Sequence, residues 1–124
     1  MNQQEFLAAM RRGESVAGST EGHEWMHKLA DQAQQLTAQL NGSYHTPEEI
    51  RQIMSEITGK PVDETFRLFP PFYTDCGKNI TIGKNVFINS ACHFQDQGGV
   101  TLEDGCLSGP QVEFATINHG QDPA

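Results

Sequence analysis

The chain has 124 residues and a formal net charge of −8, with sixteen acidic residues against eight Lys and Arg. This balance argues against binding to nucleic acids or to anionic membranes, because both attract clusters of basic residues. No apolar run approaches the roughly 18 residues of a transmembrane helix, and the polar N-terminus is unlike a signal peptide, so we expect a cytoplasmic protein.

The first 60 residues predict three helices. The first spans residues 3–12, and the second runs from about 21 to 40, where apolar residues recur at near-heptad spacing. The third begins after Thr46, a good N-cap, with Pro47 at its first position and Glu49 completing a capping box. The expected apolar faces are Trp25, Leu29, Ala33, Leu36 and Leu40 in the second helix, and Ile50, Ile53, Met54 and Ile57 in the third.

One motif in this helical region suggests a different function. His23-Glu24-Trp25-Met26-His27 fits H-E-x-x-H, which on a helix places two imidazoles on one face, with Glu24 as a possible base for a zinc-bound water. A zinc hydrolase also needs a third ligand, and His45 is the only other histidine nearby. The alternative interpretation is that His23, Glu24 and His27 are solvent-facing, which makes a zinc hydrolase a remote alternative.

From Cys76 to His119 the sequence repeats about every six residues, as in CGKNIT (76–81), IGKNVF (82–87) and INSACH (88–93). The first position of each block is mostly apolar, and a small or turn-forming residue follows it. A short period of this kind predicts a parallel β-helix, whose blocks are stable only when they stack on their neighbours. We expect Ile80, Ile82, Val86 and Ile88 to point inward.

The repeat has two irregularities. The spacing from Phe94 to Leu102 is eight residues, and the polar run 95–99 predicts a small outward bulge there. Ser108 stands where an apolar residue is expected. Three cysteines, an odd number without a C-x-x-C pair, are best interpreted as small core residues in a reducing compartment; they are Cys76, Cys92 and Cys106.

This segment resembles the hexapeptide-repeat acyltransferases, and within them the maltose/galactoside O-acetyltransferase group. The matching stretches are PPFY (70–73), GKNITIG (77–83), NVFIN (85–89) and ATINH (115–119). The resemblance implies a mainly β fold, with a left-handed parallel β-helix of hexapeptide repeats at 61–124. A small α-helical N-terminal region at 1–60 looks like the one that precedes the repeats in this group.

Members of the group continue for several coils beyond the position that matches His119, and those coils hold most acetyl-CoA contacts. The resemblance therefore implies that this chain is truncated and lacks the C-terminal cofactor-binding coils. A non-catalytic repeat fragment with a packing or assembly role remains the alternative to an enzyme. When complete, the protein is expected to be a homotrimer.

The resemblance also implies the chemistry: direct acetyl transfer from acetyl-CoA to a hydroxyl of a sugar or similar acceptor, without a metal. His119 matches the catalytic base, and Asn89 lies near acceptor and thioester, where its amide could stabilise the oxyanion. Asp75 and Asp96 match acceptor-binding positions. Considered alone, Asn89 could equally be a corner residue chosen for backbone freedom, and Asp96 a solvated loop carboxylate.

Overall fold

The computed structural model describes residues 1–14 and 20–115. Three helices come first: α1 (Gln3–Arg11), α2 (Thr20–Gly42) and α3 (Pro47–Thr58). The predicted helices are confirmed. The capping box of α3 is also present, with Thr46 Oγ1 accepting from the Glu49 N–H at 3.2 Å and Glu49 Oε1 accepting from the Thr46 N–H at 2.8 Å.

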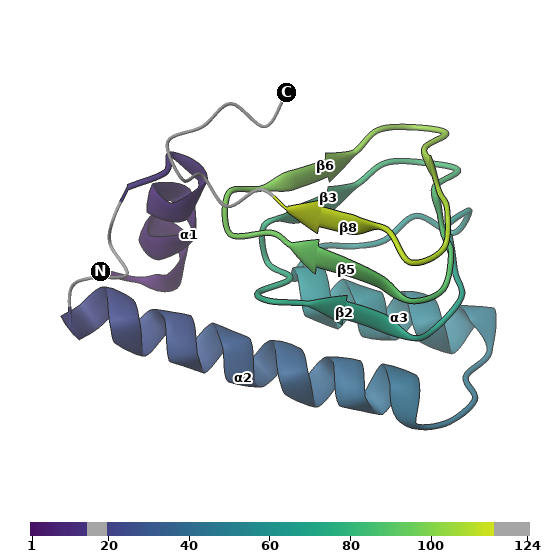
Figure 1. Cartoon of the computed structure of the whole chain (residues 1–124), viewed down its shortest axis with the longest axis horizontal. Helices are drawn as coiled ribbons and strands as arrows, with labels where there is room; N and C mark the ends of the chain where they lie inside the picture. Colours follow the sequence, from purple (N-terminus) through teal and green to yellow (C-terminus); the bar gives the residue numbers. More distant parts are fainter. Residues whose placement is uncertain (15–19, 116–124) are drawn as a thin grey trace.

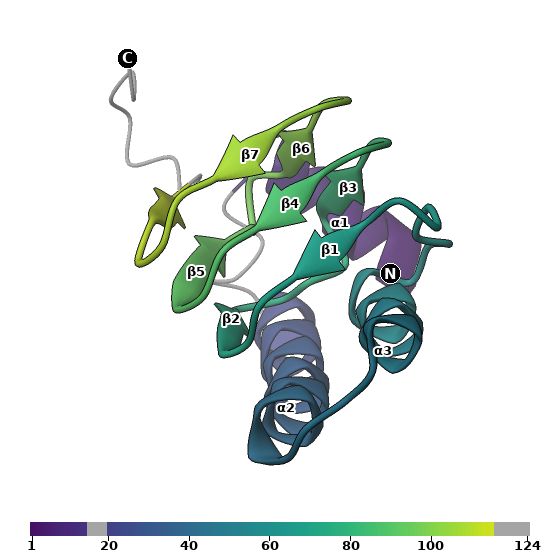
Figure 2. The same ribbon diagram turned by 90° about the vertical axis from the view of Figure 1, so that its right-hand side faces the viewer.

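Short parallel strands follow the helices. They are β1 (Arg67–Leu68), β2 (Phe72–Thr74), β3 (Ile80–Ile82), β4 (Phe87–Ile88), β5 (Cys92–Gln95), β6 (Val100–Leu102), β7 (Leu107–Ser108) and β8 (Glu113–Ala115). They form three sheets of order β1-β4-β7, β2-β5-β8 and β3-β6, and the strand pairs are parallel. The chain thus winds in successive coils, and Figure 2 shows the strands of one sheet stacked above one another.

Each coil is 20 residues long, since Phe72 pairs with Cys92 and Ile82 pairs with Leu102. The spacing of eight residues between Phe94 and Leu102 therefore recurs one coil earlier, between Thr74 and Ile82. The two wider stretches stack on each other as a regular corner. The polar run 95–99 predicted as a small bulge therefore belongs to a corner that the preceding coil repeats.

Helices α2 and α3 share a hydrophobic cluster with the strands. Its buried members come from α2 and α3, from the loops, and from the strands: Leu40, Ile50, Ile53, Met54, Ile57, Phe66, Leu68, Phe72, Ile80, Val86, Ile88, Cys92, Phe94, Val100 and Leu102. Figure 1 shows α2 below β2, and Figure 2 shows α3 below β1. Helix α2 contacts β2, and α3 contacts β1. Ile80, Val86 and Ile88 are buried as predicted, and Ile82 packs against the same cluster while partly exposed. The helical region and the described coils therefore share a hydrophobic cluster.

Two lysines join α3 to the first coil. Lys78 Nζ donates to the carbonyls of Glu56 and Ile57 at 2.8 Å, close to the end of α3, where backbone carbonyls lack helical partners. Lys60 Nζ donates to the carbonyls of Lys78 and Ile80 at 2.8 and 2.7 Å. Burial lowers the pKa of both ammonium groups. These contacts fix the position of the helices relative to the coils.

Within the described parts of the chain, no helix combines the length and the apolar character required to cross a bilayer.

Candidate functional site

The outer side of the sheet β2-β5-β8 carries polar side chains at matched positions. Side chains alternate along a strand, so Phe72, Cys92 and Phe94 point into the core while Tyr73 and His93 point outward. The register places Tyr73, His93 and Glu113 side by side on successive coils. We call this surface the β5 face: Tyr73, Asp75, His93, Gln95 and Glu113.

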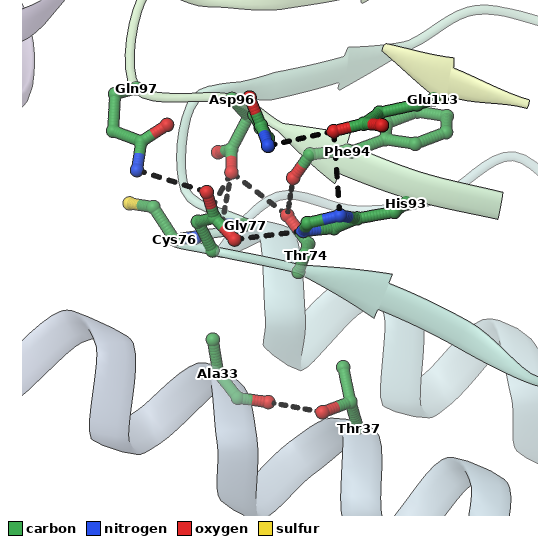
Figure 3. A network of polar contacts seen from close by, with 12 residues as sticks. Ala33, Thr37, Thr74, Cys76, Gly77, His93, Phe94, Asp96, Gln97 and Glu113 are labelled. Carbon is green, nitrogen blue, oxygen red and sulfur yellow. Dashed lines mark hydrogen bonds and ion pairs between the residues drawn. The ribbon is translucent and has the colours of Figure 1, made fainter. Parts of the chain in front are cut away.

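His93 and Asp75 form the central contact of the β5 face. His93 Nε2 lies 2.8 Å from Asp75 Oδ1, and Gln97 Nε2 donates to Asp75 Oδ2 at 3.2 Å. On the next coil, Glu113 Oε1 lies 4.0 Å from His93 Nδ1 and accepts from Gln95 Nε2 at 2.8 Å (Figure 3). Because an ionised carboxylate only accepts, this geometry assigns the shared proton to Nε2. Asp75 was predicted from the sequence as a site residue, whereas His93 was not.

Asp96 occupies a different environment from the one expected of an acceptor-binding residue. Its side chain is buried, with 0% exposure. Oδ1 accepts from Thr74 Oγ1 at 2.8 Å and from the N–H groups of Cys76 and Gly77 at 3.0 Å (Figure 3). Oδ2 accepts from the Asn79 N–H at 3.1 Å. All four donors belong to the preceding coil. Asp96 therefore holds the corner of that coil and presents no surface to a ligand, which corrects both interpretations of this residue.

The thiol at the same corner is not poised for nucleophilic chemistry. Burial, followed by the nearby Asp96 carboxylate, raises the pKa of Cys76 to about 11 from an ordinary value of 9.0. A thiolate is the nucleophilic form, so Cys76 stays protonated and inert near neutral pH. Cys76, Cys92 and Cys106 are all free. The structure thus agrees with their interpretation as small core residues.

A cavity of about 230 Å³ lies between α1, α2 and this corner. Its polar wall comes from the first coils and includes Asp75, Asn79 and Gln97. Its apolar wall comes from the helices and consists of Phe6, Leu7, Met10, Met26, Leu29 and Ala30. Gln97 Oε1 is buried and has no hydrogen-bond partner among the described residues. The volume is below the roughly 300–1,000 Å³ of sites for drug-sized ligands, so the cavity suits a small molecule or part of a larger one.

Asn89 lies at the opposite end of β5 from Asp75. Its side-chain Oδ1 accepts from the Ser90 N–H at 2.8 Å, and its Nδ2 has no acceptor among the described residues. The left-handed backbone conformation at this corner belongs to Ala91, with φ of 62°, and not to Asn89. The corner thus makes no use of the backbone freedom of an Asn here. The length of β5 separates Asn89 from Asp75, and His119 lies outside the described residues.

The two histidines of the H-E-x-x-H motif meet on the surface of α2. Their Nε2 atoms are 3.0 Å apart, and both side chains are exposed. Among residues 1–14 and 20–115, no group of three or more His, Cys, Asp or Glu side chains could hold a metal ion. A zinc hydrolase would have to take its third ligand from elsewhere.

No family model matches the chain. Among curated proteins, it is 46% identical to "Nodulation protein L" of Rhizobium leguminosarum bv. viciae over 54 residues, covering 44% of this chain and 28% of that protein. It is 34% identical to a putative acetyltransferase of Staphylococcus haemolyticus over 110 residues, covering 82% of this chain and 57% of that protein.

The fold is similar to crystal structures of a hexapeptide-repeat-containing acetyltransferase from Vibrio cholerae. One superposes with a TM-score of 0.75 at 30% identity, covering 93% of this chain and 60% of that chain. Another, of the protein complexed with acetyl coenzyme A, gives a TM-score of 0.67 at 27% identity and covers 91% and 57%. In each of these comparisons the chain spans less than two thirds of the relative's length. Together with the coiled parallel strands, these similarities support placing the chain in the hexapeptide-repeat acetyltransferase family.

Proposed function

We propose that the protein is an acetyl-CoA-dependent O-acetyltransferase of the maltose/galactoside type, built on a left-handed parallel β-helix. The observation that carries the proposal is the 20-residue winding of parallel strands in a chain similar to acetyltransferases over most of its length. The Vibrio cholerae relative was crystallised with acetyl coenzyme A, which supports the same acetyl donor here.

The proposed reaction is direct transfer. A hydroxyl oxygen of the acceptor attacks the thioester carbonyl, its proton passes to His119, and the C–S bond breaks as the new C–O bond remains. The imidazolium then returns the proton to the CoA thiolate. The side-chain Nδ2 of Asn89, which has no acceptor among the described residues, is suited to donate to the carbonyl oxygen while that oxygen carries negative charge.

Asp75 is the proposed acceptor contact. Its carboxylate lines the cavity between α1, α2 and the corner, and a carboxylate accepts hydrogen bonds from sugar hydroxyls. Gln97 Oε1 in the same wall, which has no partner within the described part of the chain, is a second acceptor for such a hydroxyl. Asp96 is not part of this proposed contact, because its carboxylate oxygens already accept hydrogen bonds from the protein.

Assembly and location complete the proposal. The complete protein is expected to form a homotrimer, as the resemblance to the maltose/galactoside group implies. Three free thiols fit a reducing compartment, so we place the protein in the cytoplasm.

The test is an acetyl-transfer assay on two proteins: the 124-residue chain, and the same chain continued by the C-terminal part of the Vibrio cholerae acetyltransferase beyond the matched region. Each is incubated with acetyl-CoA and a panel of methyl glycosides. Release of the CoA thiol and mass spectrometry of the glycoside report transfer. We expect acetyl transfer by at least the continued chain. In that chain His119→Ala should abolish transfer. His27→Ala, a matched change of an exposed histidine, should leave transfer unchanged. Two folded proteins without any transfer would favour the non-catalytic packing role.

A further inference from the structure

We propose that His93 is a positioning residue for the acceptor, acting through Asp75. It holds the Asp75 carboxylate in the wall of the cavity in one orientation, so that this carboxylate can receive an acceptor hydroxyl. The inference rests on the proposed function, because it concerns the acceptor of that reaction.

Both oxygens of Asp75 are fixed by donors from the second coil. His93 Nε2 lies 2.8 Å from Oδ1, and Gln97 Nε2 lies 3.2 Å from Oδ2. Two donors on two oxygens define the plane of the carboxylate as well as its position. A carboxylate has about four lone-pair sites, so each oxygen keeps one site for a ligand. Asp75 is therefore held in place without being saturated, unlike Asp96, whose Oδ1 alone receives three donors.

The imidazole is itself held by its neighbours. The His93 backbone N–H donates to the Val112 carbonyl at 3.0 Å, which anchors β5 against the next coil. Glu113 Oε1 stands 4.0 Å from Nδ1, on the side of the ring opposite Asp75, and Gln95 fixes Glu113 at 2.8 Å. The ring thus lies between the carboxylates of Glu113 and Asp75, and its Nε2 faces Asp75, the one that lines the cavity.

The contact between His93 and Asp75 contributes little to the stability of the fold. The side chains of His93 and Asp75 are 37% and 33% exposed, and pairs that reach solvent to this extent contribute little to folding. An orientation role for Asp75 thus predicts a loss of acceptor binding without a loss of stability. A purely structural role predicts the reverse.

The experiment compares three variants with the parent protein. His93→Leu removes the donor and keeps a side chain of moderate size. His93→Gln restores an N–H donor near the Nε2 position. His27→Leu is the matched control, since His27 is an exposed histidine on α2 that does not line the cavity.

Two quantities are measured without acetyl-CoA: the affinity for methyl β-D-galactopyranoside and methyl α-D-glucopyranoside by NMR titration, and the midpoint of thermal unfolding. His93→Leu should weaken glycoside binding roughly 10-fold, the scale of losing one hydrogen bond to a charged group. His93→Gln should stay within about threefold of the parent, and His27→Leu should match it. The unfolding midpoint should be the same in all four proteins. In the continued, active chain, the KM for the acceptor should rise in His93→Leu while the KM for acetyl-CoA stays unchanged.

Different results would refute the proposed function and the positioning role of His93. Glycoside binding that depends on His93, in a protein that never transfers acetyl, would refute the proposed function and keep the positioning role. Acetyl transfer with unchanged acceptor affinity and KM in His93→Leu would refute the positioning role alone. A parent protein that binds neither glycoside would also overturn it, as would a His93→Gln variant as weak as His93→Leu.

Discussion

The buried carboxylate of Asp96 gives the sharpest prediction of stability. Asp96→Ala leaves three backbone donors without an acceptor, the N–H groups of Cys76, Gly77 and Asn79, whereas the Thr74 hydroxyl can still donate to the Phe94 carbonyl at 3.0 Å. Each buried unpaired donor costs about 1–3 kcal/mol, so even the lower end for all three gives about 3 kcal/mol. Small domains have unfolding free energies of about 5–15 kcal/mol, so this variant should lose a large part of its stability.

A conservative variant removes the negative charge of Asp96 and its Oδ2 contact while keeping the contacts of Oδ1. In Asp96→Asn, the amide oxygen can keep the three donors that meet at Oδ1. The amide nitrogen then faces the Asn79 N–H, where Oδ2 now accepts at 3.1 Å, and two donors oppose each other. We expect a loss of about 2 kcal/mol, between the parent and the Ala variant.

The control is Asp104→Ala. Asp104 Oδ1 accepts from the Lys84 N–H at 2.7 Å, but this carboxylate is exposed and water can replace it. The expected cost is about 1 kcal/mol or less. Urea unfolding followed by circular dichroism measures all three variants against the parent. The reasoning would be refuted if Asp96→Ala stayed within about 1 kcal/mol of the parent, or if Asp104→Ala cost as much.

The other predictions concern the same region and the proposed base. Gly77 has φ of +84°, and a Cβ there would lie 2.7 Å from the Ile57 carbonyl oxygen, whereas a Cβ at Gly42 would meet nothing within 4 Å. Gly77→Ala should therefore lose about 2 kcal/mol or more in urea unfolding, and Gly42→Ala should be neutral or slightly stabilising; equal effects would contradict the steric argument. Burial raises the pKa of Cys76 from 9.0 to about 11, so the native thiol keeps a proton that the unfolded chain releases in between. This pKa difference contributes up to about 3 kcal/mol to the unfolding free energy. The contribution is fully present below the pKa of the unfolded chain and is lost as pH rises through the pKa of the folded protein. The difference in unfolding free energy between the parent and Cys76→Ala should accordingly shrink from pH 9 to 11, and a constant difference would count against it. In a chain that transfers acetyl, His119→Ala should lower turnover roughly 100-fold or more, as measured by CoA thiol release, and full activity would remove His119 from the mechanism.

The parts of the fold that depend on local signals were predictable. The capping box at Thr46 and Glu49 marks the start of α3, and the spacing of apolar residues marks the length of α2. The inward column of Ile80, Val86 and Ile88 follows from the short repeat in the same way. Each of these signals lies within a few residues of the feature that it predicts.

The contacts of Asp96 and His93 were not predicted, because the partners of both residues lie one coil away. The polar run 95–99 looks like a solvated loop until the register places it over Cys76, Gly77 and Asn79, whose N–H groups need an acceptor. His93 could have been found from the alternation in Cys92-His93-Phe94-Gln95, which directs it outward. Its contact with Asp75, 18 residues earlier, depends on the coil length, and the irregular hexapeptides obscure that length.

The constant offset between paired strands limits how this sequence can change over evolution. Phe72 pairs with Cys92, Ile80 with Val100 and Phe87 with Leu107, always 20 positions apart. Compensating substitutions among related sequences should therefore concentrate at a separation of 20, as a line parallel to the diagonal of a covariation map. A single-residue insertion within a strand would invert the inward and outward positions that follow in that strand, so length variation should be confined to the corners.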